Sequence, residues 1–366
     1  MDSSKAEKLK SLIYTTLSTM LSKMLFDNVS FKNLSTPWSL AACFLMGAFY
    51  VLSLYLWSNQ YRFNRNASSV IIRRFISVIL TCIVCFLFIG FIGQRDDTTG
   101  GHTLLKWVGL RVDVYVLAST VLALILTTIL FAGPIVQYVI GSYASRYSQN
   151  MYLNELRSNQ RADGEQQQAS TQEAFNYSAL DHLSYLLKSR LDVRRNLADL
   201  LFWRNYVISP FTEEFVFRSC MLPLLVAHLD YKYCIFITPL FFGLAHLHHM
   251  LEGYKVNNMP LKHLVAQHLF QFMYTYVFGV YSSYLFVRTG NLFASFASHS
   301  FCNLMGFPNI GELVHDFDRR TRNLLIFVYV LGLILFIVLL VPLTTPKLFD
   351  NYVYFNNLTS NIWRSF

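Results

Sequence analysis

Residues 208–220, with the sequence ISPFTEEFVFRSC, place two glutamates and one arginine inside a stretch that is otherwise apolar enough to lie in a lipid bilayer. Two later apolar stretches, FFGLAHLHH at 241–249 and ASHSFCN at 297–303, carry further polar side chains. The polar residues concerned are Glu213, Glu214, Arg218, His246, His299 and Asn303. An ionisable side chain at the centre of a bilayer costs about 2.5–3.5 kcal/mol, so this complementary set indicates a catalytic centre buried in a membrane protein.

The composition of the chain supports a membrane protein. Hydrophobic residues make up 54% of the sequence and charged residues only 14%, whereas soluble domains usually contain about 25% charged residues. Uncharged stretches long enough to span a bilayer are Trp38–Trp57, Phe75–Gly93, Val114–Ile140, Leu264–Val287 and Leu324–Leu343. Shorter apolar runs are Tyr233–Leu247, Asn291–Phe307 and the region around Leu200–Leu225. We therefore expect an all-α polytopic protein of about eight transmembrane helices that enclose an intramembrane catalytic cavity.

A single membrane domain is expected, because the sequence contains no internal repeat and no Gly-rich phosphate loop. The expected parts are an N-terminal interfacial segment at 1–37, N-terminal membrane helices at 38–198 with a polar cytosolic loop at 141–198, a catalytic membrane core at 199–345 and a C-terminal tail at 346–366. Apolar residues at three- and four-residue spacing across 1–26 favour an interfacial amphipathic helix, with a packed surface helix as the alternative.

The distribution of charge predicts how the chain is oriented. The net charge of +9 is scattered among loops, which does not favour a nucleic-acid partner. Residues 58–74 contain four arginines and no acidic residue, and 141–198 is also rich in basic residues, whereas basic and acidic residues balance in 94–113. The positive-inside rule therefore places 58–74 and 141–198 in the cytosol and the N-terminus in the lumen. Residues 158–178 are expected to form a flexible cytosolic loop.

The six cysteines all lie inside apolar runs and are expected to be buried free thiols. No disulfide framework or zinc ribbon is indicated. Cys82 and Cys85 form an isolated C-x-x-C pair without a neighbouring redox fold, so this pair is assigned no function. No cofactor or metal is expected.

Helical spacing predicts how the polar residues are arranged. Glu214 and Arg218 are four residues apart and can pair on one helical face, which leaves Glu213 on an adjacent direction and free to face a cavity. His299 and Asn303 are also four apart, so both can direct donors to one point. Each pair has a structural alternative, namely a buried ion pair that braces two helices and a hydrogen bond between packed helices. The combination favours catalysis.

These residues resemble the motifs of a known family. EEFVFR at 213–218 is similar to E-E-x-x-x-R, Phe242 to His246 is similar to F-x-x-x-H, and His299 to Asn303 is similar to H-x-x-x-N. Their order and their apolar setting resemble the CAAX prenyl protease type 2 family, the Ras-converting endopeptidases, within the wider CAAX-protease and bacteriocin-processing group. The motif region covers about 100 residues.

The resemblance implies a multi-pass endopeptidase of the endoplasmic reticulum membrane, with an active site open to the cytosol. Its substrates would be prenylated C-terminal CAAX proteins such as small GTPases, cleaved after the prenyl-cysteine. In this family's pattern, Glu213 with His246 activates a water, and His299 with Asn303 forms the oxyanion hole. Glu214 and Arg218 would orient the site, supported by Phe242.

Three other classes of protein remain open. The first is a zinc-dependent intramembrane protease, although the H-E-x-x-H motif is absent. Its ligands would come from His246, His248, His249 and His299. The second is a transporter with a buried Glu/His proton relay, which should show repeat-related broken helices that the sequence does not contain. The third is a noncatalytic membrane scaffold.

Overall fold

The computed structural model describes residues 27–57, 65–96, 101–161, 198–248 and 260–355, together with residue 250 and scattered positions before residue 27. The longer helices are α2 (Thr36–Ser53), α3 (Ser68–Ile92), α5 (Val114–Leu130), α6 (Ala132–Arg161), α12 (Tyr231–His246), α14 (Leu261–Thr289), α15 (Leu292–Met305) and α17 (Arg319–Leu343). Shorter helices are α4 (Leu104–Trp107), α9 (Leu200–Trp203), α10 (Ser209–Glu214), α11 (Met221–Val226), α16 (Ile310–His315) and the 3-10 turn η5 (Pro346–Phe349). The expected interfacial helix at 1–26 falls largely outside the described residues.

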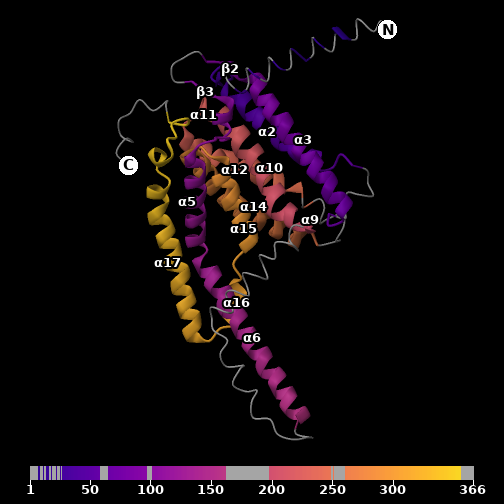
Figure 1. The fold of residues 1–366 in the computed structure, drawn as a ribbon, viewed down its shortest axis with the longest axis vertical. Helices are drawn as coiled ribbons and strands as arrows, with labels where there is room; N and C mark the ends of the chain where they lie inside the picture. Colours follow the sequence, from indigo (N-terminus) through magenta and orange to yellow (C-terminus); the bar gives the residue numbers. More distant parts are fainter. Residues whose placement is uncertain are drawn as a thin grey trace.

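Helices make up most of the described chain, and α5, α6 and α17 follow the long axis of the molecule (Figure 1). Among the described residues, α2, α3 and α17 are each long and apolar enough to cross a membrane, and α5 with the first part of α6 adds a fourth span if the bent pair counts as one. The pair bends by 62°. Pro134 follows the break and cannot donate a hydrogen bond to a carbonyl in the preceding turn, which explains the bend. The all-α polytopic class is therefore confirmed.

The remaining expected spans correspond to the run from α9 to α11 and to α12, α14 and α15. These helices are shorter or carry more polar residues than α2, α3 and α17, so their length and composition alone do not identify them as membrane spans. Val216, Cys220 and Leu222 in this inner group have no exposed surface, whereas only 11% of the apolar window of α17 is buried. The segment 215–225 is thus enclosed by other helices, whereas α12 and α14 also expose apolar side chains such as Phe236 and Leu269.

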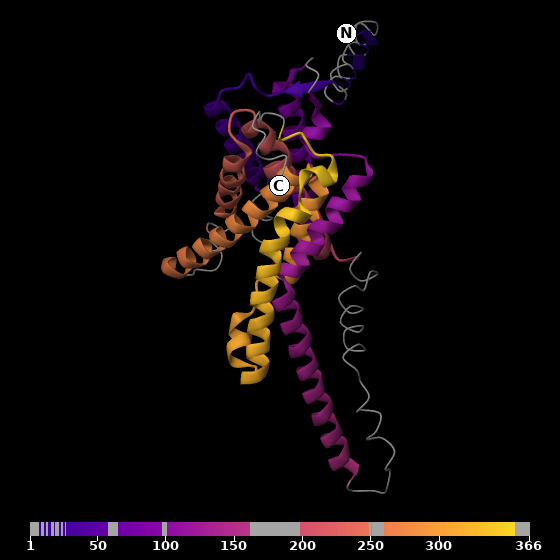
Figure 2. The same ribbon diagram turned by 90° about the vertical axis from the view of Figure 1, so that its left-hand side faces the viewer.

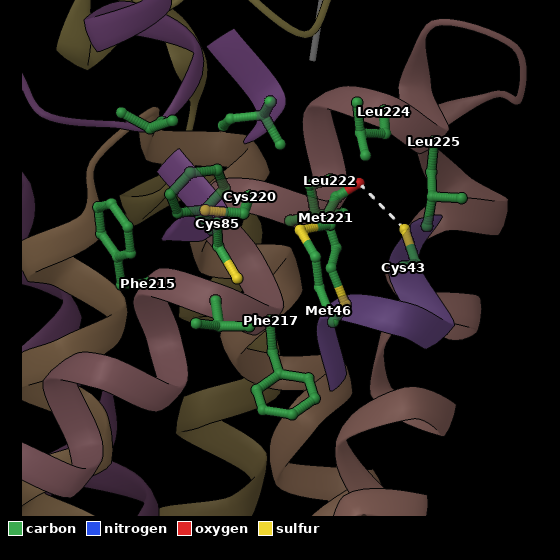
Figure 3. Close-up of a cluster of buried hydrophobic side chains, with 14 of the residues drawn as sticks. Cys43, Met46, Cys85, Phe215, Phe217, Cys220, Met221, Leu222, Leu224 and Leu225 are labelled. Atoms are coloured by element: carbon green, nitrogen blue, oxygen red, sulfur yellow. Dashed lines mark hydrogen bonds between the residues drawn. The ribbon is translucent and has the colours of Figure 1, made fainter. Parts of the chain in front are cut away.

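Apolar side chains of α2, α3 and the segment 215–225 form the main core (Figure 3). Cys43 of α2 directs its Sγ to the carbonyl oxygen of Met221, 3.8 Å away, and Phe217 packs edge-on against Tyr50. All six cysteines are free, as expected; four are buried, and Cys82 and Cys302 are partly buried.

A small sheet closes one end of the bundle. Strand β1 (Asn28–Ser30) pairs antiparallel with both β2 (Gln94–Arg95) and β3 (His102–Thr103). The Trp107 indole donates to the carbonyl oxygen of Val29 at 2.9 Å. The segment before α2 and the segment after α3 therefore lie at the same end of the molecule, opposite the C-terminal end of α6 (Figure 1).

Two of the expected segments contain ordered structure that composition did not indicate. Residues 141–161, expected as the start of a polar loop, continue α6, because this stretch lacks proline and contains no glycine after Gly141 to interrupt a helix; Figure 2 shows α6 extending beyond the bundle. Residues 162–197 lie outside the described residues. Within the expected tail at 346–366, Phe349 and Tyr354 are buried, and Asn351 donates to the carbonyl of Val287 at 2.8 Å. Residues 356–366 lie outside the described residues.

Candidate active site

The two glutamates stand where a helix changes its pitch. Two π-helical turns, η3 (Arg204–Ile208) and η4 (Phe215–Cys220), flank α10, which ends at Glu213 and Glu214. Pro210 lies in the first turn of α10 and leaves out one backbone hydrogen bond. π-helical turns are rare and occur often at functional sites. The local geometry therefore marks this run as a candidate site.

The carboxylate of Glu214 is fully buried and accepts hydrogen bonds from three side chains. Arg218 Nη1 donates to its Oε1 at 3.1 Å, His299 Nδ1 donates to the same oxygen at 2.8 Å, and Ser282 Oγ donates to Oε2 at 2.5 Å. The predicted Glu214–Arg218 pair is thus confirmed, with neither side chain exposed. A charge in this position is tolerated because it is paired and hydrogen-bonded.

Glu213 faces a different environment from its neighbour. Its side chain is 18% exposed, and its Oε2 lies 3.7 Å from His299 Nε2. This separation is longer than a direct hydrogen bond. The imidazole of His299 therefore lies between the two carboxylates, bonded to Glu214 and facing Glu213.

The Arg218 guanidinium is held between aromatic rings. Its Cζ lies 4.4 Å from the ring centroid of Phe242 and 5.9 Å from that of Phe278, close enough for cation–π attraction. Its Nε and Nη2 have no hydrogen-bond partner among the described residues. Gly279 leaves the room for this arrangement, because an added Cβ would lie 3.1 Å from Arg218 Nη2 and 2.7 Å from the Pro239 Cβ.

Phe242 brings the two candidate histidines together. Its ring centroid lies 4.6 Å from that of His246 and 6.1 Å from that of His299, in edge-on contacts. His246 Nδ1 donates to the carbonyl oxygen of Phe242 at 2.8 Å, so Nε2 is the nitrogen that can act on a substrate or water. The two histidines come from α12 and α15 and share one aromatic neighbour.

Asn303 is placed less centrally than the spacing of H-x-x-x-N indicates. Its Nδ2 donates to the carbonyl oxygen of Asn205 in η3 at 2.9 Å, and the residue is exposed. This bond ties α15 to the run that carries the glutamates. Both predicted oxyanion donors, His299 and Asn303, are therefore engaged with protein groups in the free structure.

Comparisons with known proteins point to one family. Residues 196–305 match the family model described as type II CAAX prenyl endopeptidase Rce1-like. CAAX prenyl protease 2 of Homo sapiens is 35% identical over 313 residues, which covers 86% of this chain and 83% of that protein. The chain belongs to the CAAX prenyl protease 2 family. The Arabidopsis thaliana member is 30% identical over 323 residues, covering 87% of this chain and 94% of that protein. No solved structure matches the chain.

Membership of the CAAX prenyl protease 2 family makes this protein a membrane peptidase. The predicted site residues, from Glu213 to Asn303, all lie within the matched residues 196–305. The described residues contain no group of three or more His, Cys, Asp or Glu side chains that could hold a metal ion, and His249 lies outside them. His248 Nδ1 donates to the carbonyl of Ala245 at 2.5 Å.

Sequence reasoning missed several residues that surround the glutamates. Ser282 and Phe278 of α14 contact Glu214 and Arg218 respectively, and neither stood out by spacing. The Tyr50 hydroxyl lies 3.0 Å from Thr212 Oγ1, next to Glu213. Thr212 Oγ1 donates to the carbonyl of Ile208, so Tyr50 is the donor in this contact. The sequence signal that could have identified Ser282 was the pair of serines, Ser282 and Ser283, inside an apolar helix. Polar residues in such helices usually face the bundle interior.

Proposed function

We propose that this protein removes the last three residues of prenylated CAAX proteins by hydrolysis after the prenyl-cysteine, with Glu213 as the base. The observation that carries this proposal is the division between the two adjacent carboxylates. Glu214 has three side-chain donors and no exposure, whereas Glu213 is partly accessible and faces His299 Nε2. Two carboxylates in different environments are suited to different roles.

The proposed reaction begins with a water held by Glu213 and His246. Glu213 takes a proton from this water while the oxygen bonds to the carbonyl carbon of the prenyl-cysteine. The carbonyl oxygen becomes an oxyanion and accepts from Asn303 and from His299 Nε2. Because His299 Nδ1 already donates to Glu214, this second donation from Nε2 requires His299 to be an imidazolium, with a proton on each ring nitrogen. Asn303 can keep its bond to Asn205 and offer its second N–H. When the C–N bond breaks, the proton on Glu213 passes to the leaving amine of the tripeptide.

The proposed location is the endoplasmic reticulum membrane, with the site open to the cytosol. Support comes from the sheet, which groups β1, before α2, with β2 and β3, after α3, at one end. Arg65 precedes α3 and Arg74 lies in the second turn of this helix, so both are toward the end of α3 that is opposite the sheet, where the positive-inside rule favours the cytosol. Prenylated tails, including those of small GTPases, would then enter from the side on which they are made.

A reconstituted assay tests this function. Purified protein in liposomes would be given a prenylated CAAX peptide and the same peptide without the lipid, and release of the tripeptide would be followed. We expect cleavage of the prenylated peptide and little of the other. A protein that binds the prenylated peptide without cleaving it would favour the scaffold class. Activity that disappears after exhaustive chelation and returns with zinc would favour the zinc mechanism over a glutamate base.

A further inference from the structure

Hydrogen bonds of two buried serines, which no sequence motif marks, link the helices α10, α14 and α15. Ser282 Oγ of α14 donates to Glu214 Oε2 at 2.5 Å, and the Ser282 carbonyl accepts from Ser295 Oγ of α15 at 3.1 Å. Ser295 is one helical turn before His299, whose Nδ1 donates back to Glu214 Oε1 at 2.8 Å. Glu214, Ser282 and Ser295 have no exposed surface.

The partner of Ser282 differs from those of other hydroxyls on the same helix. Thr275 and Thr289 donate to carbonyls of α14 itself, at 2.8 and 2.7 Å, which is the usual arrangement in apolar helices. Ser282 instead donates across the helix interface to a carboxylate. Hydrogen bonds to charged groups are about twice as strong as neutral ones.

The three donors are divided between the two oxygens of the Glu214 carboxylate. Arg218 and His299 both bond Oε1 of Glu214, and Ser282 is the side chain that bonds Oε2. The terminal torsion of a glutamate is broad, so a carboxylate held by one oxygen can turn. Holding Oε2 fixes the direction of Oε1, which in turn sets the imidazole of His299 and directs its Nε2 toward Glu213.

We propose that Ser282 is a positioning residue for the peptidase reaction, acting through Glu214 on His299. This inference rests on the proposed function. A small displacement of a reacting group can lower the rate greatly, so Ser282→Ala should lower kcat by about tenfold or more. KM should change by less than about twofold, because Ser282 is fully buried and cannot touch the substrate.

Ser283 supplies a matched control. It is the next residue on α14, is equally buried, and its Oγ has no hydrogen-bond partner among the described residues. The test compares wild type, Ser282→Ala, Ser283→Ala and Ser282→Thr in liposomes with a prenylated CAAX peptide, with kcat expressed per folded protein counted by size-exclusion chromatography. We expect Ser283→Ala to match wild type and Ser282→Thr, which keeps the hydroxyl, to recover most of the lost kcat.

The outcomes separate this inference from the proposed function. An inactive wild type would overturn the proposed function. An active wild type with Ser282→Ala as active as Ser283→Ala would overturn only the role of Ser282. Equal losses in Ser282→Ala and Ser282→Thr, or a loss seen in KM rather than kcat, would assign the serine to packing and overturn the positioning role as well.

Discussion

Glu213 and Glu214 are adjacent in the chain but stand on opposite sides of one imidazole: His299 Nδ1 lies 2.8 Å from Glu214 Oε1, and its Nε2 lies 3.7 Å from Glu213 Oε2. Glu214 is buried and accepts from three side-chain donors, whereas Glu213 is the partly exposed carboxylate. This arrangement assigns orientation to Glu214 and leaves Glu213 for chemistry, which is the basis of the predictions that follow.

Glu213→Gln should lower cleavage of a prenylated CAAX peptide by at least about a hundredfold, because glutamine keeps the size of the side chain but cannot take a proton. Its melting temperature in detergent should stay near that of wild type, since Glu213 is not part of the buried ion pair.

Glu214→Gln is the matched control for the base. It removes the charge that faces Arg218 in a fully buried pair, and breaking such a pair is strongly destabilising. Its melting temperature should therefore fall clearly below that of Glu213→Gln. A Glu213→Gln protein that keeps most of its activity would rule out Glu213 as the base.

His299→Ala and Asn303→Ala should each lower kcat by about 10²–10³-fold with a much smaller change in KM, as expected for oxyanion donors. Steady-state kinetics on the reconstituted enzyme would measure both. For Asn303 the structure offers a second role, because its Nδ2 is bonded to the Asn205 carbonyl. A rise in KM with kcat preserved would reassign Asn303 to substrate positioning.

Gly279→Ala should destabilise the protein by about 1–3 kcal/mol, the usual cost of overpacking a core. The added Cβ would lie 2.7 Å from the Pro239 Cβ and would press on the Arg218 guanidinium. Gly47→Ala is the control, because its Cβ would meet Phe217 at an ordinary 3.5 Å. Thermal unfolding in detergent compares the two, and equal melting temperatures would contradict the tight packing around Arg218.

Protease added to sealed microsomes should cut within residues 158–178, while residues 94–113 should be protected. The prediction follows from the positive-inside rule and from the sheet that groups Asn28–Ser30 with residues 94–103. Antibodies against the two segments would identify the fragments. Asn28 and Asn33 begin glycosylation sequons close to α2, so absence of glycan there is uninformative. Protection of 158–178 would invert the topology and exclude cytosolic prenylated substrates.

The composition and the length of the apolar stretches were sufficient to predict the membrane class, and spacing was sufficient to predict the Glu214–Arg218 pair. The pair depends on local geometry, since residues four apart in a helix are neighbours whatever surrounds them. Composition did not predict the local structure of residues 141–161, which were expected as the start of a polar loop and continue α6 as a helix. Polar composition shows that a segment faces water and does not exclude a helix.

What the sequence by itself determined is therefore the apolar helices, the order of the motif residues and the pairing within single helices. Only the tertiary structure decided that Ser282 bonds Glu214, that Phe242 contacts both His246 and His299, and that Asn303 is tied to Asn205. The physical reason is separation along the chain. Ser282 and Glu214 are 68 residues apart, so their contact depends on how α10, α14 and α15 pack together, and no periodicity within one helix encodes that packing.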